Sequence, residues 1–375
     1  MKKYGFLLFS ILSFGCQMNK HNIAIDWKEG DSLPDIENQK HIGVAGPITG
    51  IIGNKLIIAG GANFPEKMPW DGGVKKYQQD VYFYDINSDG KLKYIGRQDF
   101  KDSLAYSANI SIDNKLFSIG GEREGQATSD VIVYYLDNDL FIRQDVVYPN
   151  LPVPLTNGAV VHVDNTLYFA GGENADIVSN KIYALDLKTS NSTWKEFVEL
   201  PKPLSHAVFL NDDNGNLYVI GGRKRNSNAK SDIYKEVYKI DIRTKEIQPL
   251  GEVPEQLAAG TGLFYDDNIL VFGGDNGSTF HQVEQLIADI NLSSDEGYKK
   301  MLVDQKNKIQ RAHPGFNKNV WVLNVKDNIW YPSTSIIGES PVTTTAILYN
   351  NRVIIPSGEI KAGVRTNQIL VGQIQ

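Results

Sequence analysis

Charged and amide side chains recur at one position of this sequence, directly after short β-rich runs that end in glycine. Brought together in space, such a set would bind a small ligand that is polar, anionic or hydroxylated. The alternative is that these charges only pair with one another. The set comprises Asn63, Glu122, Arg123, Glu173, Asn174, Arg223, Asp275, Asn276 and Glu359.

Motifs for metal, nucleotide or nucleophilic chemistry are missing from the sequence. Its six histidines have no metal-ligand spacing, and a single cysteine cannot form a cluster. No Gly-x-Ser-x-Gly elbow, phosphate loop or dinucleotide fingerprint occurs. We therefore expect no metal and no cofactor. One histidine, His206, either faces a channel or packs in the core.

The glycines that precede the charged set form an internal repeat. Five β-rich runs end in a glycine pair, beginning at Gly60, Gly120, Gly171, Gly221 and Gly273, and a sixth, degenerate copy ends in Ser357-Gly358. The spacings are 60, 51, 50 and 52 residues, then 84 to Ser357. A period near 50 residues is typical of a kelch propeller blade, so we predict an all-β, six-bladed kelch-type β-propeller.

The two ends of the chain predict how the ring closes. The sixth copy runs out at Gln375, where its third strand would end, so that blade lacks a fourth strand. Asp26-Trp27 followed by Leu33-Pro34 is similar to the end of the third repeat, where Trp194 precedes Leu200-Pro201. We expect the N-terminal strand to pair with the C-terminal blade, which removes a free sheet edge. Residues 26–375 would then form one domain.

Two stretches exceed the repeat period, at residues 63–80 and 275–318. Both lie between the second and third strands of a blade, and Gln282 to Ile309 has apolar spacing compatible with short helices. Long insertions on one face of a propeller often form walls or lids of a binding site. The alternative is that they are variable surface loops.

The N-terminus is typical of a secreted protein. Lys2 and Lys3 precede a short apolar run, which predicts a signal peptide over residues 1–15. Gly15-Cys16 resembles a bacterial lipoprotein cleavage site, so we expect a lipid on Cys16, a tether over residues 16–25 and a periplasmic location, with the anchor as the sole membrane contact. The alternative is an ordinary signal peptide that leaves a free thiol. In either case no disulfide can form within the chain.

The charge balance argues against nucleic acid as a partner. Removal of residues 1–15 takes away two lysines and no acidic residue, which leaves 36 basic against 44 acidic residues, or −8. Nucleic-acid binding requires a basic surface.

The sixth copy carries a distinctive segment, Gly358-Glu359-x-Lys361-x-Gly363-x-Arg365-Thr366. It resembles the active-site segment of bacterial N-acetylneuraminate epimerases, the sialic acid mutarotases, which are six-bladed kelch propellers. Because the segment is C-terminal here and mid-chain in those enzymes, the sequence is similar to the cyclically permuted branch of the family. Gly60 to Pro65 also resembles that branch. Ala362 replaces the family proline before Gly363.

The resemblance implies that Glu359 and Arg365 are the catalytic pair. Glu359 would serve as the acid/base, and Arg365 would hold the sugar carboxylate. Arg123 or Arg223 could hold that carboxylate instead, and Asn63, Arg123, Glu173 and Arg223 are the further substrate-binding candidates. The alternative is that Glu359 and Arg365 only tie the closing blade together.

The sequence thus predicts a mutarotase that interconverts the α and β anomers of N-acetylneuraminate, with a small sugar acid as its substrate. A second possibility is a non-catalytic propeller that binds glycan or protein, because a fold alone does not fix function. A copper oxidase of the kelch type is disfavoured, because the lone cysteine is assigned to the lipid.

Overall fold

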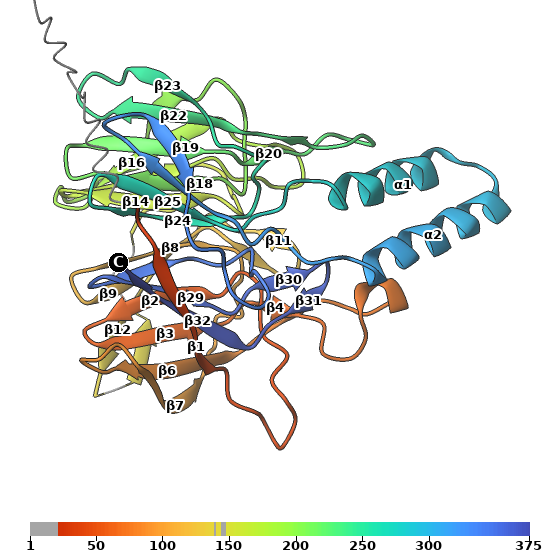
Figure 1. Cartoon of the computed structure of the whole chain (residues 1–375), viewed down its shortest axis with the longest axis horizontal. Helices are drawn as coiled ribbons and strands as arrows, with labels where there is room; N and C mark the ends of the chain where they lie inside the picture. Colours follow the sequence, from red (N-terminus) through yellow and green to blue (C-terminus); the bar gives the residue numbers. More distant parts are fainter. Residues whose placement is uncertain (1–21, 139, 144–147) are drawn as a thin grey trace, which may run out of the picture.

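The computed structural model describes residues 22–138, 140–143 and 148–375, and the signal peptide and Cys16 lie outside these ranges. Six antiparallel sheets of four strands form a six-bladed β-propeller, which confirms the predicted fold class (Figure 1). The first strands of blades one to five lie beside one another in chain order around a central channel.

The first three blades follow the order of the chain. Blade one contains β2 (Ile48–Ile52), β3 (Lys55–Ala59), β6 (Asp80–Ile86) and β7 (Leu92–Asp99). Blade two contains β8 (Ala108–Ile112), β9 (Lys115–Ile119), β12 (Val131–Asp137) and β13 (Leu140–Arg143). Blade three contains β14 (Ala159–Val163), β15 (Thr166–Ala170), β16 (Lys181–Asp186) and β17 (Lys195–Glu199).

The last three blades include the strand from the N-terminus. Blade four contains β18 (Val208–Asn211), β19 (Asn216–Ile220), β22 (Glu236–Asp241) and β23 (Ile247–Glu252). Blade five contains β24 (Thr261–Tyr265), β25 (Asn268–Phe272), β26 (Val320–Asn324) and β27 (Ile329–Pro332). Blade six contains β28 (Ile347–Tyr349), β29 (Arg352–Pro356), β32 (Gln368–Ile374) and β1 (Ile25–Ser32).

The second strand of each blade is nearly all buried, since it has a neighbouring blade on each face. Aromatic side chains of the third strands also pack between neighbouring blades. Tyr134 packs in the cluster shared by blades one and two, and Tyr183 in the cluster shared by blades two and three. These two tyrosines therefore serve to pack neighbouring blades together.

The ring closes as the sequence predicts. The N-terminal strand β1 pairs antiparallel with β32 from Ile25↔Ile374 to Ser32↔Gln368 and becomes the outer strand of blade six (Figure 1). Trp27 anchors it, because its indole Nε1 donates to Thr334 O over 3.0 Å and its ring packs edge-on against Phe272. The closure thus combines sheet pairing with an aromatic contact to blade five.

Trp27→Ala is expected to lower the free energy of unfolding by about 3–5 kcal/mol, the usual cost of removing a buried aromatic side chain. Trp27 is 6% exposed, so nearly all of its contact area would be lost. Denaturant unfolding measures the change. Lys28→Ala on the same strand is the control, because its side chain is 72% exposed. Equal stability of the two variants would show that β1 does not hold the ring closed.

A closed ring of backbone hydrogen bonds surrounds the channel just before the first strand of every blade. Each of six residues donates its N–H to the carbonyl of the equivalent residue in the preceding blade, over 2.7–3.1 Å. All six have left-handed φ values between 50° and 60°, although only one is glycine. Such strain in larger residues is usually kept where the position serves a site. The residues are Gly46, Tyr106, Asn157, His206, Ala259 and Thr343.

The two insertions lie at this end of the propeller. The first forms β4 (Ala62–Asn63), the short helix η1 (Pro69–Asp71) and β5 (Lys76–Tyr77), and the second forms α1 (Phe280–Leu292) and α2 (Glu296–Arg311). The two helices project as an antiparallel hairpin (Figure 1) and lie where the apolar spacing was compatible with short helices. The insertions meet through an ion pair of 2.5 Å between Arg311 Nη2 and Asp71 Oδ1.

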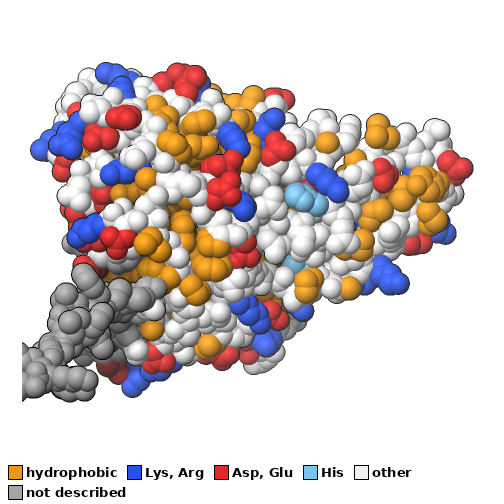
Figure 2. Space-filling model, turned by 45° about the horizontal axis from the view of Figure 1, so that its top comes forward, with side chains coloured by type: hydrophobic (Ala, Val, Ile, Leu, Met, Phe, Trp, Pro, Cys, Tyr) orange, Lys and Arg blue, Asp and Glu red, His pale blue; other side chains and the backbone are white. Residues whose placement is uncertain are grey.

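The far part of the helical hairpin exposes apolar side chains, which form orange patches on the projecting arm in Figure 2. Leu292 is 73% exposed and Met301 54%. The opposite, buried side of α1 includes Val283 and Leu286.

Three further two-stranded hairpins lie on the same end of the propeller, namely β10 (Glu122–Arg123) with β11 (Gln126–Ala127), β20 (Arg223–Lys224) with β21 (Asp232–Ile233), and β30 (Glu359–Lys361) with β31 (Val364–Arg365).

Candidate functional site

A cavity of about 520 Å³ lies at the mouth of the channel, under the two insertions. Four residues of the backbone ring, Tyr106, His206, Ala259 and Thr343, form its floor and also line a second cavity of about 380 Å³ inside the channel. The walls of the larger cavity come from β30 and β31, from residues 64–75 and from α1 and α2. The insertions are therefore walls of a site, and the volume suits a small ligand.

Glu359 and Arg365 face each other across the β30–β31 hairpin, where they are register partners. Arg365 Nη2 lies 3.5 Å from Glu359 Oε2, and the side chains are 5% and 19% exposed. Glu359 Oε1 accepts a hydrogen bond of 2.7 Å from Gly363 N. Gly363 has φ +80°, and a Cβ there would lie 2.8 Å from Pro69 Cδ, so the turn requires glycine.

The Arg365 guanidinium is held in place, but not all of its hydrogen-bond donors are paired. It stacks over Phe64 at 4.8 Å, while its Nε and Nη1 atoms are buried and have no hydrogen-bond partner among the described residues. Two unpaired donors on a buried cation are costly unless an acceptor occupies the site. The Nε and Nη1 donors thus provide an anion-binding position next to the Glu359 carboxylate.

Three residues that the sequence did not indicate surround this pair. Burial raises the pKa of Tyr106, and Arg365 and Lys75 offset this only in part. Burial likewise lowers the pKa of His313, whose Nδ1 accepts from Gly315 N over 3.0 Å. At neutral pH Tyr106 is a protonated phenol, and His313 is a neutral imidazole that carries its proton on Nε2. Lys75 forms an ion pair with Glu122.

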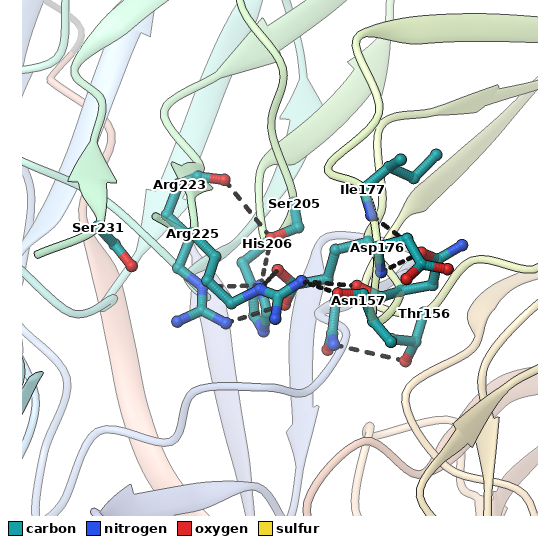
Figure 3. Close-up of polar contacts among 12 residues, drawn as sticks. Thr156, Asn157, Asp176, Ile177, Ser205, His206, Arg223, Arg225 and Ser231 are labelled. Atoms are coloured by element: carbon teal, nitrogen blue, oxygen red, sulfur yellow. Dashed lines mark hydrogen bonds and ion pairs between the residues drawn. The ribbon is translucent and has the colours of Figure 1, made fainter. Parts of the chain in front are cut away.

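A second cluster lies across the cavity on blades three and four, and Figure 3 shows Arg223, Arg225, Ser205 and His206 gathered in it. Glu173 is 7% exposed, and its Oε1 lies 2.9 Å from Arg223 Nη2. Burial acts to raise the pKa of Glu173, but the positive charges around it prevail and lower the pKa. Arg223 Nε donates to His206 Nδ1 over 3.4 Å. Glu173 therefore positions Arg223, which lines the cavity.

His206 gives this cluster a dependence on pH. Burial, followed by the Arg223 charge, lowers the pKa of His206 from 6.5 to about 3. The unfolded chain takes up a proton below pH 6.5 and the folded chain does not, so the free energy of unfolding should fall as the pH drops from 6.5 toward 3. His206→Asn should make this decline less steep, as measured by melting temperatures, since asparagine tolerates the left-handed backbone. Parallel melting curves against pH for the two proteins would contradict this assignment.

Three of the four predicted substrate-binding residues, namely Asn63, Arg123 and Glu173, lie outside the cavity lining, and only Arg223 lies in it. Asn63 is buried, and its side-chain amide bonds to Gly43 O and Gln78. Arg123 bonds to Asp130 and to the carbonyl of Asp102 within its own blade. The prediction grouped every residue after a glycine pair in one ligand site, whereas the side chains of Asn63 and Arg123 bond to protein groups instead.

The cavity offers acid–base and anion-binding groups. In residues 22–138, 140–143 and 148–375, no three His, Cys, Asp or Glu side chains are grouped in a way that could hold a metal ion. Glu359, Tyr106 and His313 can hold or transfer a proton, and Arg365 and Arg223 can bind negative or carbonyl oxygens.

These features define a six-bladed β-propeller with a carboxylate–guanidinium pair in a cavity at one mouth. A family model described as N-acetylneuraminate epimerase matches residues 15–142 and 148–375, and the chain belongs to this family. A solved structure titled "Structure of YjhT" superposes with a TM-score of 0.61 at 15% identity, over 92% of this chain and 99% of the other, and shares the fold.

Curated relatives named N-acetylneuraminate epimerase align over part of their length. The Salmonella typhimurium relative is 30% identical over 59% of this chain and 57% of its own length. The Salmonella enteritidis relative is 29% identical over 59% and 56%, and the Haemophilus influenzae relative is 25% identical over 60% and 59%. The chain thus spans less than two thirds of the curated relatives that it matches.

Proposed function

We propose that this protein is a mutarotase that interconverts the α and β anomers of N-acetylneuraminate. The observation that carries the proposal is the pair of Glu359 and Arg365 in the cavity. The Glu359 carboxylate lies beside the Arg365 guanidinium, which has two buried, unpaired donor atoms. In this sugar acid the carboxylate is attached to the anomeric carbon, so an arginine that binds it brings the reacting centre to the neighbouring carboxylate. The family and the names of the relatives support the same substrate.

Arg365 would hold the substrate carboxylate by charge-assisted hydrogen bonds from its unpaired donors. Glu359 Oε2 is the oxygen assigned to proton transfer, since Oε1 accepts a hydrogen bond from Gly363 N and Oε2 has, among the described residues, only the 3.5 Å ion pair with Arg365 Nη2. The Glu359 carboxylate takes the proton of the anomeric hydroxyl while the bond from the anomeric carbon to the ring oxygen breaks. It then returns that proton to the ring oxygen, which leaves an open-chain ketone.

Ring closure is the reverse sequence on the other face of the ketone. Rotation within the open chain presents that face, Glu359 takes the proton from the attacking hydroxyl, and the ketone oxygen receives it. No net proton is gained or lost. Tyr106, which stays protonated because its pKa is raised, would donate a hydrogen bond to the oxygen on which charge develops.

The test follows freshly released α-N-acetylneuraminate by proton NMR, with and without residues 17–375. A protein-free control is needed because this sugar mutarotates unaided. Faster approach to the same anomer equilibrium is the expected result. A folded protein that gives no acceleration would overturn the proposal and favour the non-catalytic binding propeller.

We propose separately that Cys16 is lipidated and anchors the propeller at the periplasmic side of the cell envelope. The sequence around Gly15-Cys16 supports this. In the described ranges, no helix is long and apolar enough to cross a membrane. Cys16→Ala should move the full-length protein from the membrane fraction to the soluble fraction of the expressing bacterium and abolish labelling by palmitate. Wild-type protein that is unlabelled and soluble would contradict the anchor.

A further inference from the structure

The part of the cavity that blades four and five build with the second insertion has a chemical character of its own. It is lined by Arg223 of blade four, Asp275 of blade five, and Ile233, Phe280 and Val283. We call this set the distal half. It combines one cation, one carboxyl and an apolar wall, and the proposed ring opening uses none of them.

The polar groups of the distal half each keep one hydrogen-bonding position open. Asp275 Oδ1 accepts from Gly277 N over 2.8 Å, whereas its Oδ2 accepts no hydrogen bond from the described residues. Arg223 uses Nη2 for Glu173 and Nε for His206, and its Nη1 donates to none of the described residues. One acceptor and one donor are thus available to a ligand in this part of the cavity.

The apolar wall above them is fixed rather than loose. Ser231 bonds to both carboxylate oxygens of Glu284 on α1, over 2.6 and 2.9 Å, and His281 Nε2 lies 3.0 Å from Ser231 O. These contacts hold α1 against the β20–β21 hairpin. The Phe280 ring consequently stacks over the Arg223 guanidinium at 5.1 Å, and Val283 is only 7% exposed.

This arrangement matches an acylamino group, which presents one N–H donor, one carbonyl acceptor and an apolar methyl group. We propose that the distal half is the acylamino subsite, in which Asp275 accepts from the substrate N–H, Arg223 donates to the acyl oxygen, and Phe280 and Val283 contact the methyl group. The inference rests on the proposed function, in which Arg365 holds the carboxylate in the same cavity. It assigns to the second insertion the recognition of the substituent.

The subsite is tested by comparing N-acetylneuraminate with its deamino analogue, which has a hydroxyl in place of the acetamido group. Saturation-transfer NMR measures catalysed exchange between the anomers of each free sugar at equilibrium. We expect the wild-type protein to favour the N-acetyl sugar in kcat/KM by at least about tenfold, as expected where a site hydrogen-bonds the missing group. Asp275→Ala and Phe280→Ala should each lower this ratio toward one.

The control is Gln285→Ala, an exposed change on the same helix, which should keep the wild-type ratio. Equal exchange of the two sugars by the wild-type protein would overturn the subsite and leave the mutarotase proposal standing. A fall in the rates of both sugars by the same factor in folded Asp275→Ala would also overturn it, because Asp275 would then bind a group that both sugars share. Catalysis of neither sugar by the wild-type protein would instead refute the proposed function itself.

Discussion

Glu359→Gln is expected to lower kcat for anomer exchange by about 10²- to 10⁴-fold, the usual contribution of a positioned acid/base. Glutamine has nearly the same shape, and its amide oxygen can still accept the hydrogen bond from Gly363 N, so the hairpin should keep its conformation. An amide cannot take the proton of the anomeric hydroxyl. Saturation-transfer NMR at equal protein concentrations measures the loss.

The control for this substitution is Glu339→Gln, a carboxylate near the β30–β31 hairpin but outside the cavity lining. Its side chain is 43% exposed and lies 4.0 Å from Lys361. We expect wild-type exchange rates for this variant. If Glu359→Gln retained the wild-type rate while binding the sugar normally, proton transfer would have to be assigned to another cavity residue.

Arg365→Lys is expected to weaken kcat/KM by roughly 30- to 4,000-fold, equivalent to about 2–5 kcal/mol for truncating one partner of a buried charge pair. An ammonium lacks the separate Nε and Nη1 donors, and it also loses the stacking of the guanidinium on Phe64. The loss should appear mainly in KM if Arg365 only binds the carboxylate. It should extend to kcat if Arg365 also orients the anomeric carbon against Glu359.

Arg123→Lys separates this effect from a general cost of replacing arginine. Arg123 bonds to Asp130 and Asp102 O outside the cavity lining, so kcat/KM should not change. The structural alternative, in which Glu359 and Arg365 only tie the closing blade together, predicts that Arg365→Lys lowers the melting temperature and leaves turnover near normal. That result would remove Arg365 from the substrate site.

The fold was predictable because each blade repeats the same local requirements. A second strand with a blade on each face must be apolar along most of its length, and its end needs glycines with left-handed φ, as at Gly60 and Gly61. These requirements appear in the sequence as a motif with a period near 50 residues. The closing strand was predictable for a similar reason, because the sequence around Trp27 repeats the pattern around Trp194.

The candidate site was predictable only where one short segment contains its residues. Glu359 and Arg365 belong to a single hairpin, so their spacing of six residues already places them opposite each other. Asn63 and Arg123 follow the same glycine rule but bond to protein groups instead of lining the cavity. Position after a strand sets where a backbone emerges, whereas the direction of the side chain depends on partners elsewhere in the chain.

The sequence by itself determined the number of blades, the closure of the ring and the Glu359–Arg365 hairpin, because each depends on local spacing and burial. Only the tertiary structure decided that Tyr106 and His313 stand beside that pair and that Asp275 and Arg223 face a wall built by α1. These four residues come from three different blades and from both strand ends and insertions. They meet only once the blades are assembled into the ring, and no local pattern of residues encodes which side chains then lie together.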